Sequence, residues 1–355
     1  MSIPKHRKAI DKLDARIVRL LNERTRHVLA IGGIKLAAGE EIYAPHRERA
    51  VFDRVCKLNG GPVTGGQLRA IYREIMSSAL ALEKMMIIAY PGPEAALAHQ
   101  AAMQKFGSSL KYAAQKTIAD VFIAVSENRA NYGVVPVENS NEDVVSRTLD
   151  MFVESDLKIV SQIILPVRQC LMIPPGGQRA KIRKLYVHPQ SLAHCRGWIQ
   201  NHLPRMEIIE TPSNARSSEL ARKDKNSVAI ADVFAARKYG LDVLEQDIQD
   251  NAANTARFLV LGRQCGPPTG DDRTSLMVSV ADKAGVLQQS LAVFRRYKIY
   301  MTKIGSRPGK RKAREHFVFI DCAGHIQDQA VASAIAQLER ESNHVKVLGS
   351  YPNTD

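Results

Sequence analysis

Apolar residues in the first 86 positions follow a helical period. They recur at steps of three and four residues from 10 to 31, which predicts one long amphipathic helix. After a loop, a second helix is expected over 45–58, where Asn59-Gly60-Gly61-Pro62 stops it, and a third over 64–86. Three helices with one very long member enclose little core alone, so we expect two chains to associate through them.

Beyond residue 86 the pattern changes to short apolar runs separated by helical segments. Runs at 87–90, 132–137 and 228–231 predict buried strands, with a first helix over 95–106. Short strands that alternate with helices favour an α/β domain with a largely parallel sheet.

The last part of the chain predicts the order strand–helix–strand–strand–helix–strand. After a loop at 265–270, these elements are expected at 274–280, 287–297, 300–306, 316–321, 331–341 and 345–348. That order is typical of a ferredoxin-like βαββαβ domain, the α/β-plait. We therefore divide the chain into segments 1–86, 87–265 and 272–355.

Composition narrows the classes of function. The chain has 355 residues, of which 45% are hydrophobic and 24% charged, as in a soluble globular protein of two or three domains. No apolar run approaches the roughly 20 residues that cross a bilayer, and the charged start is unlike a secretory signal. Five widely spaced cysteines without a CxxC pair predict reduced thiols and no zinc site. We expect a cytoplasmic protein without a membrane role.

The net charge of +14 raises the question of nucleic-acid binding. The basic residues are spread along the chain, however, and the one dense run, Lys310-Arg311-Lys312 with Arg314, is typical of a solvated loop. We therefore expect no nucleic-acid partner. The excess of cations suits small dianionic substrates, which need several positive groups in one pocket.

Charged residues recur on the three helices predicted first. The positions in question are Arg7, Arg24, Lys35, Arg47, Glu48 and Glu83. Guanidinium groups clamp carboxylates in bidentate pairs, so such a set suits a substrate with two carboxylates. The set resembles the active site of the bacterial helical chorismate mutases, and the segment 1–86 is similar to that domain.

The resemblance implies how chorismate would rearrange here. The reaction needs the substrate held in a compact chair and a donor at the ether oxygen, where negative charge develops. The resemblance assigns that donor to Lys35 and implies that Arg7 reaches into the partner's site in a homodimer. Ala44 and Glu83 depart from forms of the family with aspartate and glutamine there. Ionised glutamate only accepts hydrogen bonds, so a helpful Glu83 must be protonated, which predicts activity favoured at acidic pH.

Four motifs in the middle segment resemble those of prephenate dehydratases. They are Ala-Tyr-Pro-Gly-Pro-Glu at 89–94, Gly-Val-Val-Pro-Val-Glu-Asn-Ser at 133–140, His-Pro-Gln-Ser-Leu-Ala-His-Cys-Arg at 188–196 and Asn-Thr-Ala-Arg-Phe at 254–258. The resemblance implies two α/β lobes, arranged as in periplasmic binding proteins, with prephenate between them and no cofactor. The implied site residues are Glu138, Asn139, Ser140, His188, Gln190, Ser213, Asn214, Thr255, Ala256, Arg257 and Phe258. Among them, Arg257 is expected to clamp a carboxylate of the substrate.

Ala256 stands where the family has the threonine thought to protonate the leaving ring hydroxyl. Further departures fall at 94–97, at 141–143 and at Val187. Without an acid the leaving group is hydroxide, which is costly inside a pocket. Electrons released by decarboxylation can instead be captured by a proton at a ring carbon, which keeps the hydroxyl. We therefore expect a non-aromatising prephenate decarboxylase, like those of antibiotic pathways, giving a dihydro-4-hydroxyphenylpyruvate.

Two alternatives remain open. Thr255 can supply the missing hydroxyl if the backbone shifts slightly, which leaves an ordinary prephenate dehydratase that makes phenylpyruvate. The middle and last segments can also form a catalytically silent, ligand-sensing unit that governs the mutase. His99 and His188 are candidate proton donors to the ring, and the sequence does not choose between them.

The last segment resembles the ACT domains that bind phenylalanine in this family. The resemblance rests on Lys-Ala-Gly-Val-Leu at 283–287 and Thr-Lys-Ile-Gly-Ser-Arg-Pro at 302–308. The implied effector residues are Gly285, Val286, Leu287, Gly305, Ser306, Arg307 and Pro308. Members usually have Gly-Ala-Leu and Glu-Ser-Arg-Pro, so Val286 adds bulk and Gly305 removes a carboxylate. These departures put phenylalanine binding in doubt, while pairing of ACT domains across a dimer is expected to survive.

Overall fold

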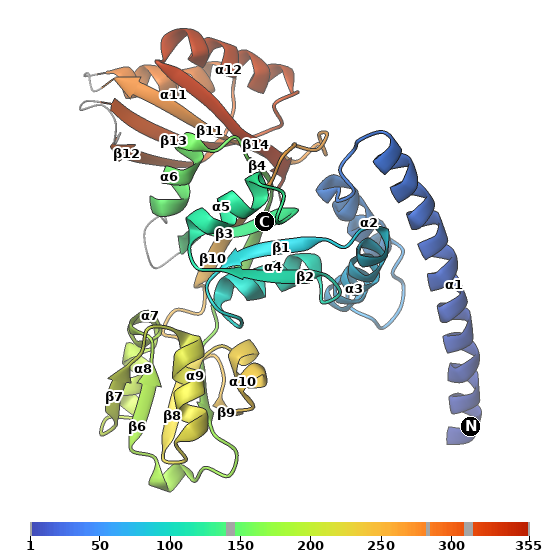
Figure 1. Cartoon of the computed structure of the whole chain (residues 1–355), viewed down its shortest axis with the longest axis vertical. Helices are drawn as coiled ribbons and strands as arrows, with labels where there is room; N and C mark the ends of the chain where they lie inside the picture. Colours follow the sequence, from blue (N-terminus) through green and yellow to red (C-terminus); the bar gives the residue numbers. More distant parts are fainter. Residues whose placement is uncertain (1, 140–145, 282–284, 309–314, 354–355) are drawn as a thin grey trace.

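The computed structural model describes residues 2–139, 146–281, 285–308 and 315–353. The chain forms a helical module, two α/β lobes and a C-terminal α/β module (Figure 1). Lobe 1 lies between the C-terminal module and lobe 2, and the helical module is attached to its side. Within the described part of the chain, no helix combines the length and the apolar character that a membrane span requires.

The helical module consists of α1 (Ile3–Ala37), α2 (Pro45–Lys57) and α3 (Gly65–Glu83). Helix α3 begins with a capping box, in which Thr64 accepts from the backbone N–H of Gln67 and the Gln67 side chain accepts from that of Thr64. The three predicted helices are thus present. The ends of α2 and α3 lie within three residues of those expected, and α1 extends beyond the apolar stripe at 10–31 in both directions.

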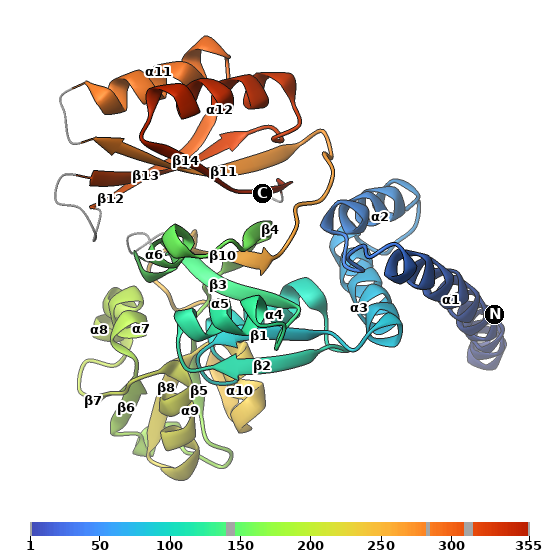
Figure 2. The ribbon, with the colours of Figure 1, turned by 45° about the horizontal axis from the view of Figure 1, so that its top comes forward.

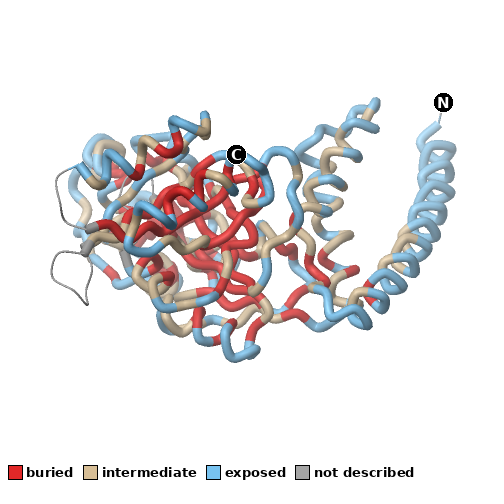
Figure 3. The backbone as a smooth tube through the Cα atoms, turned by 90° about the horizontal axis from the view of Figure 1, so that it is seen from above, coloured by how far each residue is buried: buried red, intermediate tan, exposed pale blue. Residues whose placement is uncertain are grey.

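Helix α1 extends away from the rest of the chain in two views (Figures 1 and 2). Figure 3 shows it exposed over most of its length, and Gly32 is its only buried residue. The apolar stripe that predicts this helix is therefore uncovered in the single chain, with Ile10, Leu13 and Ile17 exposed by 54%, 52% and 51%. Burial of an apolar side chain stabilises by about 1.5–3 kcal/mol, so the stripe favours a partner surface.

Lobe 1 is a mixed sheet with the strand order β2-β1-β3-β10-β4. Its strands are β1 (Ile87–Pro91), β2 (Lys111–Gln115), β3 (Tyr132–Asn139), β4 (Lys158–Pro166) and β10 (Thr255–Gly262). Its helices are α4 (Leu97–Phe106), α5 (Ile118–Ser126) and α6 (Ser146–Glu154). Strands β1, β2 and β3 are parallel, whereas β10 runs antiparallel to both β3 and β4.

Lobe 2 is built in the same way, with the order β7-β6-β8-β5-β9. Its strands are β5 (Cys170–Ile173), β6 (Lys184–Val187), β7 (Glu207–Glu210), β8 (Ser227–Ala231) and β9 (Asp242–Glu245). Its helices are η1 (Arg179–Lys181), α7 (Pro189–His194), α8 (Arg196–His202), α9 (Asn214–Lys223) and α10 (Val233–Tyr239). Strand β5 is antiparallel to β8 and β9. In each lobe four of the five strands run in the same direction and one strand next to a lobe connection, β10 or β5, runs against them. The expected largely parallel sheet is thus present as two separate sheets.

Two segments of the chain connect the lobes, and they hydrogen-bond to each other. The backbone N–H of Val167 donates to the carbonyl of Asn254 over 2.9 Å. The N–H of Gln169 donates to Oε1 of Gln249 over 2.8 Å. The two connecting segments between lobe 1 and lobe 2 are therefore held together by hydrogen bonds.

The C-terminal module has the predicted βαββαβ order. Its elements are β11 (Asp272–Ala281), α11 (Val286–Arg296), β12 (Met301–Pro308), β13 (Glu315–Ala323), α12 (Gln329–Glu341) and β14 (His344–Pro352). The antiparallel sheet has the order β12-β13-β11-β14, which is the ferredoxin-like arrangement. One face of the sheet shares a core with α11 and α12, and the other contributes Met277, Phe319 and Leu348 to the core of lobe 1.

Candidate active sites

A cavity of about 180 Å³ lies between the three helices of the helical module. Its charged lining residues are Arg24, Lys35, Arg47, Glu48 and Glu83. Apolar side chains, among them Val28, Ile31 and Leu80, form the rest of the wall. The structure thus brings together all the positions expected for a mutase site except Arg7. Arg7 lies 17 residues before Arg24 on α1, about 25 Å along the helix axis, and cannot reach the cavity of its own chain.

The cations of this cavity keep donors available for an anion. Nη1 of Arg24 is buried and has no hydrogen-bond partner among the described residues. Nζ of Lys35 donates to the carbonyls of Glu41 and Ile42, over 3.3 and 3.0 Å. An ammonium group has three donors, so Lys35 is oriented by the loop and retains one donor.

The two acids of the cavity lie in different surroundings. Burial raises the pKa of Glu83, and the neighbouring Lys35 opposes this effect. A side chain at Gly32 would have its Cβ 2.5 Å from a carboxylate oxygen of Glu83, so it would force that carboxylate to shift from its place in the cavity. The Glu48 carboxylate accepts from the hydroxyl of Tyr43 over 3.2 Å and pairs with Lys105 over 2.7 Å. The sequence did not indicate Gly32, Tyr43 or Lys105, and Lys105 belongs to a different module.

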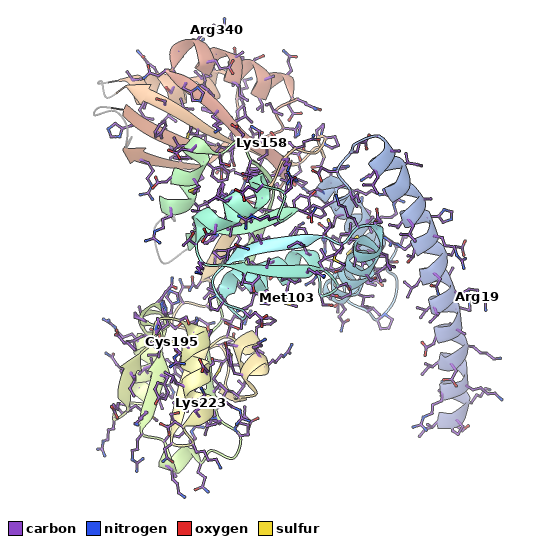
Figure 4. All side chains as sticks on the ribbon, viewed as in Figure 1. Arg19, Met103, Lys158, Cys195, Lys223 and Arg340 are labelled. Carbon is purple, nitrogen blue, oxygen red and sulfur yellow. The ribbon has the colours of Figure 1, made fainter. Side chains whose placement is uncertain are left out.

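The predicted site residues of lobe 2 gather where its strands end and helices begin. His188 and Gln190 begin α7, and Nδ1 of His188 accepts from the backbone N–H of Gln190 over 3.3 Å. Ser213 caps α9 by accepting from the N–H of Arg216, and Oδ1 of Asn214 accepts from the hydroxyl of Ser191. In Figure 4, Cys195 at the end of α7 marks the half of lobe 2 that is nearer to lobe 1. The carboxyl ends of parallel strands form the usual ligand edge of such sheets.

Ala256 lies at the corresponding edge of lobe 1. It pairs with Asn139 in the sheet, and its methyl group is buried in the cluster that contains Tyr90, Ala98 and Leu165. Thr255 precedes it on the same strand, and successive side chains of a strand point to opposite faces. The hydroxyl of Thr255 therefore lies on the face away from that cluster. Phe258 shares the face of Ala256 and is buried in the core, and Ser140 lies outside the described residues.

Arg257 faces the C-terminal module, in contrast to the expected substrate clamp. Its guanidinium donates to Oε1 of Gln162 over 3.0 Å, to Oδ2 of Asp321 over 2.6 Å and to the hydroxyl of Tyr351 over 2.9 Å. Glu138 lies on the same face, where it pairs with Lys303 of β12. Arg257 points this way because successive side chains of a strand alternate between the two faces of the sheet, so positions 255, 257 and 259 lie on the face that Ala256 does not occupy. In this structure Arg257 and Glu138 thus join two modules and do not line the edge that faces lobe 2.

Contacts between the lobes involve residues of α4 and α10. The ring of His99 stacks on Tyr90 with centroids 4.6 Å apart and meets the ring of Phe234 from lobe 2 at 5.5 Å. Burial lowers the pKa of His99, which favours the neutral imidazole. Asp232, which caps α10 by accepting from the N–H of Ala235, has a pKa raised by burial. Asp232 was not among the residues expected from the sequence, although an aspartate directly after the apolar run 228–231 indicates a polar group at the end of a buried strand.

The residues expected to bind an effector lie in two places of the C-terminal module. Gly285, Val286 and Leu287 form the start of α11, where Gly285 has the left-handed φ of 85°. Gly305, Ser306, Arg307 and Pro308 lie on the edge strand β12. Gly305 also borders a cavity of about 40 Å³ against Arg257 and Asp321, at the joint with lobe 1.

The fold and the two sites are those of a two-module enzyme class, in which a helical module with a charged cavity is joined to a two-lobed α/β domain. The chorismate mutase type II family matches residues 6–84, and the prephenate dehydratase family matches residues 88–266. The bifunctional chorismate mutase/prephenate dehydratase of Aquifex aeolicus (strain VF5) is 43% identical over 98% of this chain and 96% of its own length. The chain therefore belongs to the bifunctional chorismate mutase/prephenate dehydratase family.

Two further proteins are similar to this chain, one over nearly its whole length and one over about three quarters of it. The bifunctional chorismate mutase/prephenate dehydratase of Stutzerimonas stutzeri is 40% identical over 97% of this chain and 95% of its own length. Among solved structures, the prephenate dehydratase of Arthrobacter aurescens in complex with L-Phe is 30% identical, with a TM-score of 0.70. That match covers 76% of this chain and 90% of the other.

Proposed function

We propose that the chain converts chorismate to prephenate in the cavity of the helical module and then acts on prephenate between the lobes. The observation that carries the first activity is the buried, unpartnered Nη1 of Arg24 beside Lys35 and Arg47. Buried donors without partners cost free energy, so they favour an anionic ligand that completes their hydrogen bonds. A dianion such as chorismate suits three cations in one cavity.

The rearrangement needs no covalent step. The cavity would hold the compact form of chorismate, and the remaining donor of Lys35 would face the ether oxygen on which charge develops. Glu83 would help in its protonated form, which its raised pKa makes more accessible. Lewis acids and cofactors have no step to perform in this sequence of events.

The proposed active form is a homodimer in which α1 helices cover each other. The uncovered apolar stripe of α1 supports this arrangement, because Ile10, Leu13 and Ile17 are exposed in the single chain. Arg7 lies on the same exposed half of α1. In a dimer it would be free to complete the cavity of the partner, as the resemblance implies.

For prephenate, the relatives favour dehydration to phenylpyruvate. The Aquifex and Stutzerimonas proteins are named chorismate mutase/prephenate dehydratases, and they cover nearly the whole chain. This reverses the order of the two candidates expected from the sequence, in which decarboxylation came first. The lyase activity is thus best described as prephenate dehydratase.

A second candidate is supported by position 256. Its methyl group cannot donate a proton, and Thr255 lies on the other face of β10. In non-aromatising decarboxylation, the bond to the ring carboxylate breaks, carbon dioxide leaves, and the electron pair moves through the diene to a ring carbon. A proton is added at that carbon, and the hydroxyl stays. His99 and His188 are the candidate donors of this proton.

Product analysis tests both proposals. Purified chain is supplied with chorismate and separately with prephenate, and the products are followed by mass and ultraviolet spectrum. Phenylpyruvate supports the dehydratase, and a hydroxylated, non-aromatic keto acid that has lost only carbon dioxide supports the second candidate. Prephenate that persists while chorismate is consumed contradicts both and indicates a silent sensing module.

We further propose that the C-terminal module is an ACT domain. Its βαββαβ order and antiparallel sheet support this, as does the Arthrobacter relative, which was solved in complex with L-Phe. The substitutions at Val286 and Gly305 predict weak phenylalanine binding. Calorimetric titration with phenylalanine tests this, and submicromolar binding would contradict it.

A further inference from the structure

One ion pair joins the cavity of the helical module to the α/β domain. Nζ of Lys105, near the end of α4, lies 2.7 Å from Oε2 of Glu48, which lines the cavity. The two side chains are exposed by only 15% and 11%. Solvent screens a pair at this depth much less than a surface pair, so the contact restricts where the Glu48 carboxylate lies.

Lys105 acts on this cavity from outside it. The residues that line the cavity come from the helical module and the loop between α1 and α2, and Lys105 is not among them. Lys105 instead borders a second cavity, of about 300 Å³, which lies between α2, lobe 1 and Pro352 near the end of the chain. Glu48 lines both cavities. The contact by which Lys105 can act on a ligand in the first cavity is therefore its pair with Glu48.

Without Lys105, Glu48 would compete with the substrate for cations. Arg24, Lys35 and Arg47 line the same cavity as Glu48. A glutamate paired with one of them would occupy donors that a dianionic ligand needs. An unpaired glutamate would repel the carboxylates of that ligand. Because Lys105 pairs with Glu48 from outside this cavity, the three cations stay available to the ligand.

The same lobe also supports the neighbouring wall. The ring of Tyr43 packs on that of Tyr132 with centroids 5.1 Å apart, while its hydroxyl donates to Glu48. The hydroxyl of Tyr132 donates to the Glu41 carboxylate over 3.1 Å, and the Glu41 carbonyl accepts from Lys35. Lys35 is thus connected to lobe 1 through Glu41, and Glu48 is connected to it through Tyr43 in addition to its direct pair with Lys105.

We propose that Lys105 is a positioning residue for the mutase reaction, a residue of the α/β domain that orients Glu48 and withholds it from the substrate-binding cations. The inference rests on the proposed mutase activity. Helix α4 also carries His99, which contacts lobe 2, so a helix about 15 Å long connects the two sites.

Steady-state kinetics of the full chain carrying Lys105→Met test the proposal. Methionine keeps most of the aliphatic stem but removes the charge, so packing is largely preserved. We expect KM for chorismate to rise about tenfold with a smaller change in kcat, because the variant removes one partner of a largely buried ion pair and leaves the Glu48 charge unpaired. Prephenate turnover should not change. Lys105→Arg should restore most of the loss, and Lys116→Met at an exposed site of the same lobe should have no effect.

A double variant separates positioning from other effects. If Lys105 acts through Glu48, then adding Lys105→Met to Glu48→Gln should change KM little further. An unchanged KM in Lys105→Met, or an undiminished loss in the Glu48→Gln background, overturns the proposal. Equal losses of both activities assign Lys105 to folding alone and overturn it too. A wild-type chain that does not consume chorismate would instead overturn the proposed function.

Discussion

Thr255 and Ala256 place their side chains on opposite faces of strand β10. Ala256 packs beneath α4 with Tyr90 and Ala98, whereas Thr255 shares the face of Arg257, which points to the C-terminal module. Because the side-chain period of a strand is two, a hydroxyl at 255 reaches the face of 256 only if the strand is turned over. A hydroxyl of Thr255 would therefore need more than a small backbone shift to reach the face of Ala256, and we predict that the residue at position 256 decides which product forms from prephenate.

Ala256→Thr should increase the formation of phenylpyruvate. The new hydroxyl would stand on the face where the resemblance places the acid, and a positioned acid contributes about 100-fold or more to a rate. The extra volume at this buried site should cost about 1–3 kcal/mol of folding free energy. Product ratios from prephenate, together with urea unfolding, measure both effects.

The matched control for that variant is Thr255→Val. It removes the neighbouring hydroxyl and keeps the side-chain shape, so the ratio of products should stay as in the wild type. If Thr255→Val abolished phenylpyruvate formation, Thr255 would be the acid, and the argument from the strand faces would be wrong.

Arg24→Met should impair the mutase reaction with little effect on stability. Nη1 of Arg24 has no hydrogen-bond partner among the described residues, so few protein contacts are lost. A lost charge-assisted contact to the transition state costs about 2.7–4 kcal/mol, which is 100- to 1,000-fold in kcat/KM for chorismate. Activity assays and thermal unfolding together check this, and a large fall in Tm with unchanged kinetics would contradict it.

Mutase activity should decrease as the pH rises through the pKa of Glu83. Burial raises this pKa above its ordinary value of 4.5. Only the protonated carboxyl can donate a hydrogen bond, so the favourable form exists below the raised pKa and is lost above it. Glu83→Gln donates at every pH and should flatten this limb of the kcat/KM profile. A variant profile that keeps the same fall would assign the titration to another group.

The sequence indicated segments that the structure places at the facing edges of the two lobes, but it did not indicate the direction of every side chain. Strand β10 is buried on both faces after its first residue, so its apolar pattern carries no polarity that could fix whether Arg257 or Ala256 faces the substrate. The mutase cavity could be predicted because its charged residues lie on helices with a clear period. Lys105 could not, because it is distant in sequence and belongs to another module.

Arg257→Met should destabilise the joint between lobe 1 and the C-terminal module. The side chains of Arg257 and Asp321 are exposed by only 8% and 13%, and the variant leaves Asp321 without its partner. Removal of one partner of a buried pair costs about 3–5 kcal/mol. Urea unfolding should show this loss, while Arg179→Met, at an exposed pair, should cost less than about 1 kcal/mol. If Arg257→Met instead raised KM for prephenate and left the free energy of unfolding unchanged, Arg257 would be a substrate-binding residue and the prediction would be wrong.

Leu13→Glu should dissociate the proposed homodimer and reduce mutase activity. The substitution puts a charge into the apolar stripe of α1, which is exposed in the single chain. Sedimentation should show a smaller species, and chorismate turnover should fall because Arg7 no longer reaches a partner's cavity. Mixing Arg7→Ala chains with Arg24→Met chains should restore part of the activity, since one mixed site is intact. A wild-type chain that sediments as a monomer and is fully active would contradict the dimer.

The order of strands in lobe 1 has a consequence for the order of events during synthesis. Strand β10 lies between β3 and β4, but it is made only after all of lobe 2. On the ribosome, β3 and β4 must therefore wait with open edges while lobe 2 emerges, and an open edge is a site of mispairing. The late strand that closes this gap is the one that carries Ala256 and Arg257. Lobe 1 thus completes its sheet and its edge of the proposed prephenate site in the same folding event.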